Sequence, residues 1–387
     1  MIWEELEDNL AALDREQLRR RRRIVDSPCG TRLTVDGRKL LAFCSNDYLG
    51  LANDPRIVDA LCEGARRWGA GSGAAHVVSG HLRPHQQLEA ALAAFVGMPS
   101  ALLFSTGYMA NLGIVPALAG RGDAIFADRL NHASLIDAAL ASGAEHKRYA
   151  HGDVDALSGL LERSAAKHKL ILTDAVFSMD GDIAPLDRLY ALTEAHDAWL
   201  VIDDAHGFGV LGQQGRGSLS HFGLPASKRI IYMGTLGKAA GVAGAFVAGD
   251  AMVIEWLQQR SRTAIFTTAH PPAVSCAVLK SLELIAAGDV RRKHLHALIA
   301  QLRRELLPLA AQHGWQLTES QMPIQPLIVG SNESSLELSA ALEAKGIWVP
   351  AIRPPTVPQG SARLRICLSA AHSEDDVAAL VAALSKI

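Results

Sequence analysis

Aromatic residues, cysteines and net charge are all scarce in this sequence. Aromatics make up 5% of the 387 residues, and 38 lysine and arginine residues nearly balance 40 aspartate and glutamate residues, which leaves a formal net charge of −2. A chain without a basic excess lacks the electrostatic attraction on which nucleic-acid binding depends. No apolar run is long enough to cross a bilayer, and the N-terminus shows no signal-peptide core. We therefore expect a cytoplasmic protein without nucleic-acid or membrane partners.

The cysteines are few, odd in number and widely separated. No two of them have the spacing of a redox motif or of a metal site, so we expect reduced thiols and no metal bound by them. The five are Cys29, Cys44, Cys62, Cys276 and Cys367.

Apolar runs of strand length alternate with helical patterns through the middle of the chain. Such alternation predicts an α/β fold, with a mostly parallel sheet covered by helices on both faces. The expected strands are residues 101–104, 124–127, 170–173, 199–202, 230–233 and 244–248. The expected helices are residues 55–68, 84–96, 108–118, 133–142, 155–164 and 185–196.

The two ends of the chain have other patterns. Residues 2–23 are predicted to form one helix, whose last five residues are arginines that either face its negative end or bind a ligand. Short strands at 31–35 and 40–43 are expected around an Asp36-Gly37 turn. Beyond residue 271, helices at 273–287, 290–312, 336–345 and from 373, with strands at 325–329 and 364–368, predict a smaller α+β domain. The expected divisions are 1–50 (N-terminal helix and strands), 51–270 (large domain) and 271–387 (small C-terminal domain).

One lysine stands alone among small and apolar residues. Lys238 lies in the segment Thr-Leu-Gly-Lys-Ala-Ala-Gly at residues 235–241. Poor solvation of such a lysine lowers its pKa and makes the amine nucleophilic. The alternative is a surface lysine on a flexible glycine loop.

Two acids follow the apolar run at residues 199–202. Asp203 and Asp204 repel each other unless one meets a positive partner, and a protonated pyridine nitrogen suits Asp203. Together, Lys238 and Asp203 suggest the protein's share of pyridoxal-phosphate chemistry. An Asp that caps a helix beside a structural His206 is the alternative for this segment.

Polar residues at other strand ends are candidates for holding the rest of such a cofactor. Gly107 and Tyr108 open a helix after a strand, where backbone N–H groups bind phosphate, and Thr235 offers a hydroxyl. His132 could stack on a flat ring, or belong to a helix cap. Ser178 could donate to the ring hydroxyl, or lie in a plain turn.

An arginine lies in a proline-rich segment near the C-terminus. Residues 353–358 read Arg-Pro-Pro-Thr-Val-Pro, and three prolines stiffen the backbone. A guanidinium held there suits recognition of a carboxylate, so Arg353 is a candidate substrate ligand. A surface loop that happens to carry an arginine is the alternative.

As an ordered set, these segments resemble the α-oxoamine synthases, a family of pyridoxal-phosphate (PLP) enzymes with the fold type I of aspartate aminotransferase. The resemblance covers almost the whole chain. It rests on Ser-Asn-Asp-Tyr-Leu-Gly-Leu at 45–51, Gly-Ser-Gly at 71–73, Val-Ser-Gly at 78–80, Phe-Ser-Met-Asp-Gly-Asp at 177–182, Asp-Asp-Ala-His-Gly at 203–207, Gly-Arg-Gly-Ser at 215–218 and Thr-Leu-Gly-Lys at 235–238. Asp174 stands where the family usually has glutamate.

The resemblance implies a role for each candidate residue. It implies that Lys238 forms the imine with PLP and moves the substrate Cα proton, and that Asp203 pairs with the pyridine nitrogen. His132 would stack on the ring, Ser178 and His206 would flank its 3-oxygen, and Gly107, Tyr108 and Thr235 would hold phosphate. The implied substrate-binding residues are Arg20, Asn46, Arg353 and Thr356. The family's homodimers imply that Thr267 or Thr268 reaches the partner's phosphate.

Within the family, residues 351–358 and 362–365 most resemble the branch that condenses L-alanine with a pimeloyl thioester, carried by CoA or an acyl carrier protein, in biotin biosynthesis. Glycine with acetyl-CoA, glycine with succinyl-CoA and serine with a long-chain acyl-CoA are the alternatives inside the family. A nucleotide-dependent oxidoreductase would need a Gly-x-Gly-x-x-Gly turn after the first strand, and none is there. A catalytically dead scaffold subunit would have no need of Lys238.

Overall fold

A computed structural model describes residues 2–387. The chain divides into two compact units. The larger unit comprises Leu49–Ser178 and Ile183–Arg292, and the smaller comprises the residues up to Tyr48, Met179–Asp182 and Lys293–Ile387. Relative to the expected divisions at 50 and 270, the N-terminal residues group with the C-terminal ones, and residues 271–292 lie in the larger unit.

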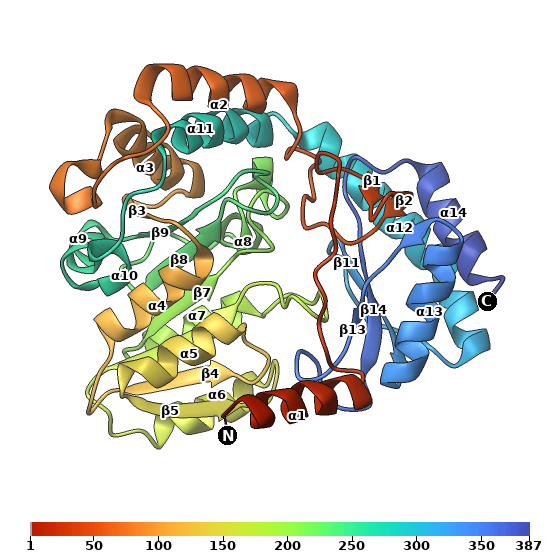
Figure 1. The fold of residues 1–387 in the computed structure, drawn as a ribbon. Coiled ribbons are helices and arrows are strands. Elements are labelled where there is room, and N and C mark those ends of the chain that lie inside the picture. Colours follow the sequence, from red (N-terminus) through yellow and green to blue (C-terminus); the bar gives the residue numbers. More distant parts are fainter. Residues whose placement is uncertain (1) are drawn as a thin grey trace. The chain divides into compact units, whose positions relative to one another are not determined.

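The larger unit is built on a seven-stranded sheet (Figure 1). Neighbouring strands pair in parallel except at β9, which is antiparallel to both of its neighbours. The mostly parallel sheet that we expected is therefore confirmed. In spatial order the strands are β3 (Ser100–Phe104), β9 (Ala245–Gly249), β8 (Ile230–Thr235), β7 (Trp199–Asp203), β6 (Lys169–Asp174), β4 (Ala124–Asp128) and β5 (Glu145–Tyr149).

Strand β5 was not expected from the sequence. Its residues are Glu-His-Lys-Arg-Tyr, and only Tyr149 is buried. It lies at the edge of the sheet, where charged side chains face water and discourage pairing with another chain. Position in the sheet rather than apolar pattern therefore makes this segment a strand.

Helices complete the larger unit. Its core lies between the sheet and helices such as α4 and α5, which pack against each other. Figure 1 shows α2 and α11 side by side. The helices are α2 (Pro55–Trp68), η1 (His76–Gly80), α3 (Arg83–Val96), α4 (Gly107–Leu118), α5 (Ala133–Ser142), α6 (Val154–Glu162), α7 (Leu186–Ala195), η2 (Gln213–Gly215), α8 (Ser218–Phe222), α9 (Ala251–Arg260), α10 (Arg262–Ile265) and α11 (Pro272–Ala286).

The smaller unit contains two small sheets. One has the order β1-β2-β12, and the other is an antiparallel sheet in the order β10-β11-β14-β13. The turn between β1 and β2 is confirmed, since Asp36 and Gly37 have φ angles of 48° and 78°, as a tight hairpin requires. The elements are α1 (Ile2–Arg15), β1 (Arg32–Val35), β2 (Arg38–Ala42), α12 (Asp289–His313), β10 (Gln316–Leu317), β11 (Ile324–Gly330), α13 (Asn332–Ala344), β12 (Ile347–Trp348), β13 (Ala351–Ile352), β14 (Ala362–Cys367) and α14 (Glu374–Leu384).

The prediction of one N-terminal helix over residues 2–23 is wrong about where the helix ends. Helix α1 stops at Arg15, and Gln17 takes a φ of 57°. The arginine run is therefore not a helix end facing the dipole. Two of its members bond to acids instead: Arg19 donates to Asp14 at 2.5 Å, and Arg23 donates to Asp36 at 2.7 Å.

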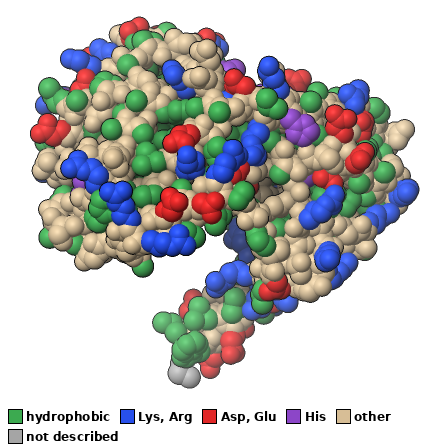
Figure 2. All heavy atoms as spheres, turned by 90° about the horizontal axis from the view of Figure 1, so that it is seen from above, with side chains coloured by type: hydrophobic (Ala, Val, Ile, Leu, Met, Phe, Trp, Pro, Cys, Tyr) green, Lys and Arg blue, Asp and Glu red, His purple; other side chains and the backbone are tan. Residues whose placement is uncertain are grey.

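Charges of both signs are spread over the surface. In the view of Figure 2, basic and acidic side chains are interspersed, and neither forms a broad field of one sign. From residue 2 onward, no helix combines the length and the apolar character that a bilayer-spanning segment needs.

Candidate active site

The candidate residues of the larger unit follow strands that end at the same edge of the sheet. β6 ends at Asp174, β7 at Asp203 and β8 at Thr235. Asp174 and Asp203 are direct neighbours in the parallel pairing of β6 with β7. Because ligands of α/β sheets bind at the carboxyl ends of the strands, this edge is the place to look for a site.

Lys238 lies in the loop between β8 and β9. Its Nζ is 2.9 Å from Nε2 of His206, which follows β7. The lysine is half-buried and the imidazole is buried. The loop is fixed by a bond from Gly241 N–H to the Lys238 carbonyl at 2.8 Å. The structure thus brings together two candidates that lie 32 residues apart in the sequence.

Gly241 allows this loop to form. Its φ is +69°, and a Cβ there would lie 2.5 Å from the backbone nitrogen of Ala52. Only glycine avoids both the unfavourable φ and the clash. Close packing against the backbone of Ala52 therefore explains the glycine at 241.

Asp203 is buried and held from two sides. Its Oδ2 accepts a hydrogen bond from Asn111 Nδ2 at 2.7 Å, and its Oδ1 accepts one from Ala205 N–H at 3.0 Å. Asn111 also donates to Ser134 Oγ at 2.8 Å. The two donors replace hydrogen bonds to water that burial removes, and they fix the orientation of the Asp203 carboxyl group at the strand end. We did not predict Asn111 from the sequence, where its signal is a lone amide in the apolar stretch of α4.

His132 lies at the start of α5 with its backbone tied to Asp174. Its N–H donates to Asp174 Oδ2 at 2.7 Å, and its Nδ1 is 2.7 Å from Ser134 Oγ. Desolvation lowers the pKa of His132, the charge of Asp203 opposes this shift, and the charge of Lys238 adds to it. Ser134 and Asn111 connect His132 to Asp203 through hydrogen bonds, so these residues lie at one place in the site. The alternative of a helix cap also holds, since His132 is the N-cap of α5.

Asp174, which replaces the family's usual glutamate, still accepts a hydrogen bond from the backbone N–H of His132. Asp174 is buried, and desolvation together with the charge of Asp203 raises its pKa well above the ordinary value. The hydrogen bond from His132 N–H acts in the opposite direction. Asp174 thus fixes the entry of the chain into α5.

Asp204, the second acid of the pair, bonds to different partners from those of Asp203. Asp204 Oδ2 accepts hydrogen bonds from Ser218 N–H at 2.6 Å and from Tyr232 OH at 2.8 Å, while its Oδ1 is buried without a hydrogen-bond partner in residues 2–387. Burial raises the pKa of Asp204 to about 7. The expected repulsion between Asp203 and Asp204 is reduced because Asp204 binds a proton readily.

Gly107 and Tyr108 form the first turn of α4. Thr106 caps this helix by accepting from Met109 N–H at 3.1 Å, and its carbonyl accepts from Ala110 N–H. Gly107 and Tyr108 precede Met109 in the first turn, where backbone N–H groups have no carbonyl partner inside the helix. Their N–H groups therefore point out of the helix end. The Tyr108 hydroxyl donates to Asp137.

The remaining candidates of the larger unit lie on connecting segments. Thr235 Oγ1 donates to the Gly244 carbonyl at 3.2 Å. Ser178 is half-buried beyond β6, Thr267 is half-buried and Thr268 is exposed after α10. For Thr267 and Thr268 the structure gives a location and no role.

Four candidates lie in the smaller unit. Arg20 donates to Thr356 Oγ1 at 3.2 Å, so these two meet across 336 residues of sequence. Asn46 Oδ1 accepts from Arg365 at 3.1 Å. Burial and, second, the charge of Arg20 lower the pKa of Arg353, whose Nε is a buried donor that no acceptor of residues 2–387 satisfies. A buried, unsatisfied guanidinium nitrogen indicates a place for an anion.

The family of the chain is decided by comparison with known proteins. The model of the family "Aminotransferase class I and II" matches residues 38–384. The chain belongs to this aminotransferase family. It is 61% identical to the 8-amino-7-oxononanoate synthase of Herminiimonas arsenicoxydans over 388 aligned positions, which cover 99% of each chain.

Solved aminotransferase-family structures have the same fold. A serine palmitoyltransferase from S. paucimobilis, solved with PLP–myriocin, matches with a TM-score of 0.90 and 29% identity, covering 99% of this chain and 96% of that one. An 8-amino-7-oxononanoate synthase from Francisella tularensis matches with a TM-score of 0.77 and 32% identity, covering 90% and 97%. The expected fold type I, the membership of the α-oxoamine synthases and PLP as cofactor are confirmed.

The residues at the strand ends fit PLP. The cluster offers an amine for its aldehyde (Lys238), a fixed carboxylate for its pyridinium (Asp203) and outward-pointing N–H groups at a helix start for its phosphate (Gly107 and Tyr108). This aminotransferase-family chain therefore has the donor set that its cofactor needs.

Proposed function

We propose that the chain condenses L-alanine with a pimeloyl thioester, with CoA or an acyl carrier protein as the thiol, to give 8-amino-7-oxononanoate, CO2 and the free thiol in biotin biosynthesis. The identity of 61% to an enzyme of that name over nearly the whole chain supports this assignment. The observation that carries the chemistry is the pair at neighbouring strand ends: the Lys238 amine 2.9 Å from His206 Nε2, and the Asp203 carboxylate held by Asn111 and Ala205 N–H.

Each residue of the larger unit has a proposed task. Lys238 binds PLP through its ε-amine and moves the proton of the substrate Cα. Asp203, held by Asn111 and Ala205 N–H, keeps the pyridine nitrogen protonated. PLP, when bound, supplies an electron sink for the carbanion at Cα.

The proposed positioning groups surround this pair. His132 covers one face of the ring, because its backbone is fixed by Asp174. His206 contacts Lys238 Nζ. Together with Ser178, it flanks the 3-oxygen of the PLP ring. The phosphate ligands that we propose are Gly107, Tyr108 and Thr235, with Thr267 or Thr268 acting across a homodimer.

Substrate recognition is assigned to the smaller unit. The half-buried Arg353, with its unsatisfied Nε, binds the carboxylate of alanine with help from Asn46. Arg20 and Thr356, which bond to each other, contact substrate. A positively charged pair of arginines suits a reaction in which both substrates carry carboxylates.

We also propose a homodimer located in the cytoplasm, with a large PLP-binding domain and a small C-terminal domain. No residue of α1 is buried, and its apolar Ile2 and Trp3 are 72% and 76% exposed. Uncovered apolar side chains of this size favour a partner surface. The five cysteines are free thiols, as a reducing compartment requires.

The decisive experiment compares Lys238→Ala with Lys228→Ala, a change at an exposed lysine of the same unit. We expect Lys238→Ala to abolish the visible absorbance of the holoenzyme and to lower turnover about 10²–10⁴-fold, whereas Lys228→Ala leaves both unchanged. A coloured Lys238→Ala variant that borohydride still labels would refute the assignment of Lys238.

Substrate choice is tested separately on the wild-type holoenzyme. We expect turnover with alanine and pimeloyl-CoA or pimeloyl-acyl carrier protein. Turnover with glycine and acetyl-CoA, glycine and succinyl-CoA or serine and a long acyl-CoA, with none for alanine, would place the chain in another branch of the family. Arg353→Lys should raise the KM for the amino acid, since lysine cannot form the bidentate pair.

A further inference from the structure

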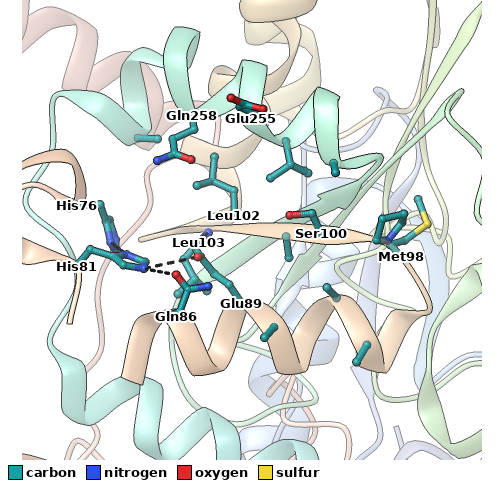
Figure 3. Close-up of a pocket in the computed structure, with 18 of the residues that line it drawn as sticks. His76, His81, Gln86, Glu89, Met98, Ser100, Leu102, Leu103, Glu255 and Gln258 are labelled. Atoms are coloured by element: carbon teal, nitrogen blue, oxygen red, sulfur yellow. Dashed lines mark hydrogen bonds and ion pairs between the residues drawn. The ribbon is translucent and has the colours of Figure 1, made fainter. Parts of the chain in front are cut away.

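A second group of ligand-type side chains lies in the larger unit at the mouth of a cavity of about 610 Å³. It is lined by residues of η1, α3, β3 and α9, none of which holds a candidate residue of the PLP site. Figure 3 shows His81, Gln86 and Glu89 turned toward one another at one end of this cavity. His81 Nε2 is 3.4 Å from Gln86 Oε1 and 3.8 Å from Glu89 Oε2.

We propose that His81 Nε2, Glu89 Oε2 and Gln86 Oε1 bind a divalent transition-metal ion of the Zn²⁺ type. Two ligands at roughly 2.0–2.2 Å from a tetrahedral ion are about 3.4 Å apart, so the observed separations need only small adjustments. Imidazole nitrogen with carboxylate and amide oxygens is a donor set for first-row divalent ions. Water in the cavity completes the coordination.

The secondary structure explains why the two oxygen ligands meet. Gln86 and Glu89 are three residues apart on α3, so they project from the same face of the helix. His81 lies in the short segment between η1 and α3, which returns the chain to that face. A bound ion would therefore join this segment to α3.

Each principal ligand is oriented by an outer hydrogen bond. Glu89 Oε1 accepts from Leu103 N–H at 3.0 Å, which leaves Oε2 for the ion. His81 Nδ1 is 2.9 Å from His76 Nδ1. Ligation at His81 Nε2 requires the proton on Nδ1, and His76 supplies the acceptor for it. Metal-binding histidines and carboxylates commonly have such partners.

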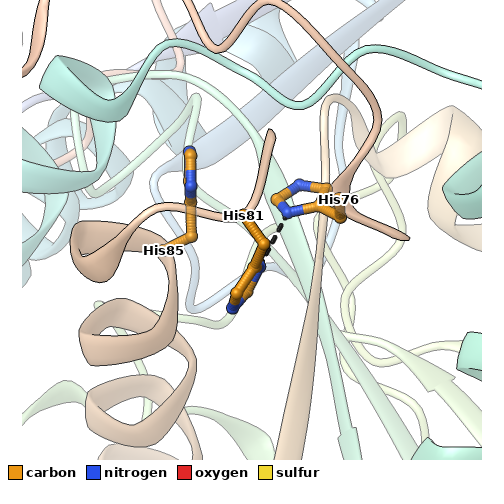
Figure 4. Close-up of side chains that lie close together, drawn as sticks. All are labelled: His76, His81 and His85. Atoms are coloured by element: carbon orange, nitrogen blue, oxygen red, sulfur yellow. Dashed lines mark hydrogen bonds between the residues drawn. The ribbon is translucent and has the colours of Figure 1, made fainter. Parts of the chain in front are cut away.

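The neighbouring His85 does not serve as a ligand, although one nitrogen of each of His76, His81 and His85 lies within 4.8 Å of the others. Figure 4 shows the bond between His76 and His81, in which His85 takes no part. His85 Nδ1 accepts from Leu82 N–H at 2.9 Å, and its Nε2 donates to the His270 carbonyl at 2.9 Å. Both nitrogens already bond to the backbone, so ligation through either of them would break one of these hydrogen bonds.

The test measures Zn²⁺ binding to the full-length PLP-loaded protein by competition with a chromophoric chelator after removal of metals. We expect one ion per chain, and an affinity lowered at least tenfold in Glu89→Gln and in His81→Gln. Glutamine at 89 keeps the acceptor for Leu103 N–H, so this variant should fold even if His81→Gln does not. Glu255→Gln is the matched control, because it removes a carboxylate from the same cavity away from His81, and its affinity should stay within twofold.

X-ray absorption of the Zn²⁺ complex gives an independent readout. One imidazole ligand with oxygen ligands is expected. The proposal is overturned if two or three imidazoles bind the ion, if Glu89→Gln binds as tightly as the wild type, or if Glu255→Gln weakens binding as much. Failure of Zn²⁺ to bind at one ion per chain overturns it as well.

Discussion

The bond from Asn111 to Asp203 allows a sharp test of how the active-site carboxylate is kept charged. Asn111 is fully buried and donates at 2.7 Å to Asp203 Oδ2, leaving Ala205 N–H as the other donor. We choose Asn111→Leu because leucine has a similar shape. Asn111 Oδ1 has no hydrogen-bond partner within residues 2–387, so the fold loses no bond at that atom.

The magnitude follows from the kind of bond that is removed. A hydrogen bond to a charged group contributes about 1.5–3 kcal/mol, which corresponds to roughly a ten- to hundredfold change in an equilibrium constant. We expect Asn111→Leu to weaken PLP binding by this factor, because a less stabilised Asp203 anion attracts the pyridinium less strongly. Ser134→Ala removes the other bond of the Asn111 amide, and with it the contact of Ser134 Oγ with His132 Nδ1, but leaves the bond to Asp203, so it should have the smaller effect.

The assay is equilibrium binding of PLP to the cofactor-free protein, followed by absorbance, with circular dichroism as a check on folding. The Asn111→Leu change is made in the wild type and in Asp203→Asn. If Asn111 acts through the charge of Asp203, its effect should shrink by more than about 1 kcal/mol in the neutral background. Equal effects in both backgrounds would refute this reasoning and leave Asn111 a packing residue.

Two further predictions concern stability. Because burial raises the pKa of Asp204 from 3.8 to about 7, its contribution to folding is complete below about pH 4 and is lost as pH rises through about 7. Asp204→Asn should therefore flatten the fall of the urea midpoint between about pH 5 and about pH 8, and an unchanged slope would contradict the assignment. Gly241→Ala should cost at least about 1–3 kcal/mol in unfolding free energy. Gly237→Ala, where a Cβ would meet only Thr235 Oγ1 at 3.9 Å, should cost less than about 0.5 kcal/mol, and equal costs for the two variants would contradict this reasoning.

The sequence predicts the location of a candidate residue where that location depends on the residue's own strand. Asp203 follows an apolar run, and such a run ends at the ligand-binding edge of a parallel sheet. Lys238 was predicted from its small neighbours, and packing against Ala52 explains one of them, Gly241. The roles of Thr267, Thr268 and the substrate arginines stay predictions.

Asn111 was missed because nothing local distinguishes it. Its partner Asp203 is 92 residues away, and an amide in an apolar helix has many possible partners until the helix is packed on the sheet. The same holds for Arg363, which donates to Asp180 across 183 residues. Contacts between residues so far apart in the sequence depend on how the helices and strands pack together. They produce no repeating pattern that the sequence could reveal.

The sequence by itself determined the alternation of strands and helices, the tight turn at Asp36-Gly37, the position of Asp203 at a strand end and that of Lys238 in a loop of small residues. These depend on repeats of two or 3.6 residues and on backbone preferences, which act over short distances. Only the tertiary structure decided the end of α1, the polar edge strand β5 and the meeting of His81 with Glu89. Those outcomes depend on which segments pack together, because burial and partners, rather than local preference, set the free energy there.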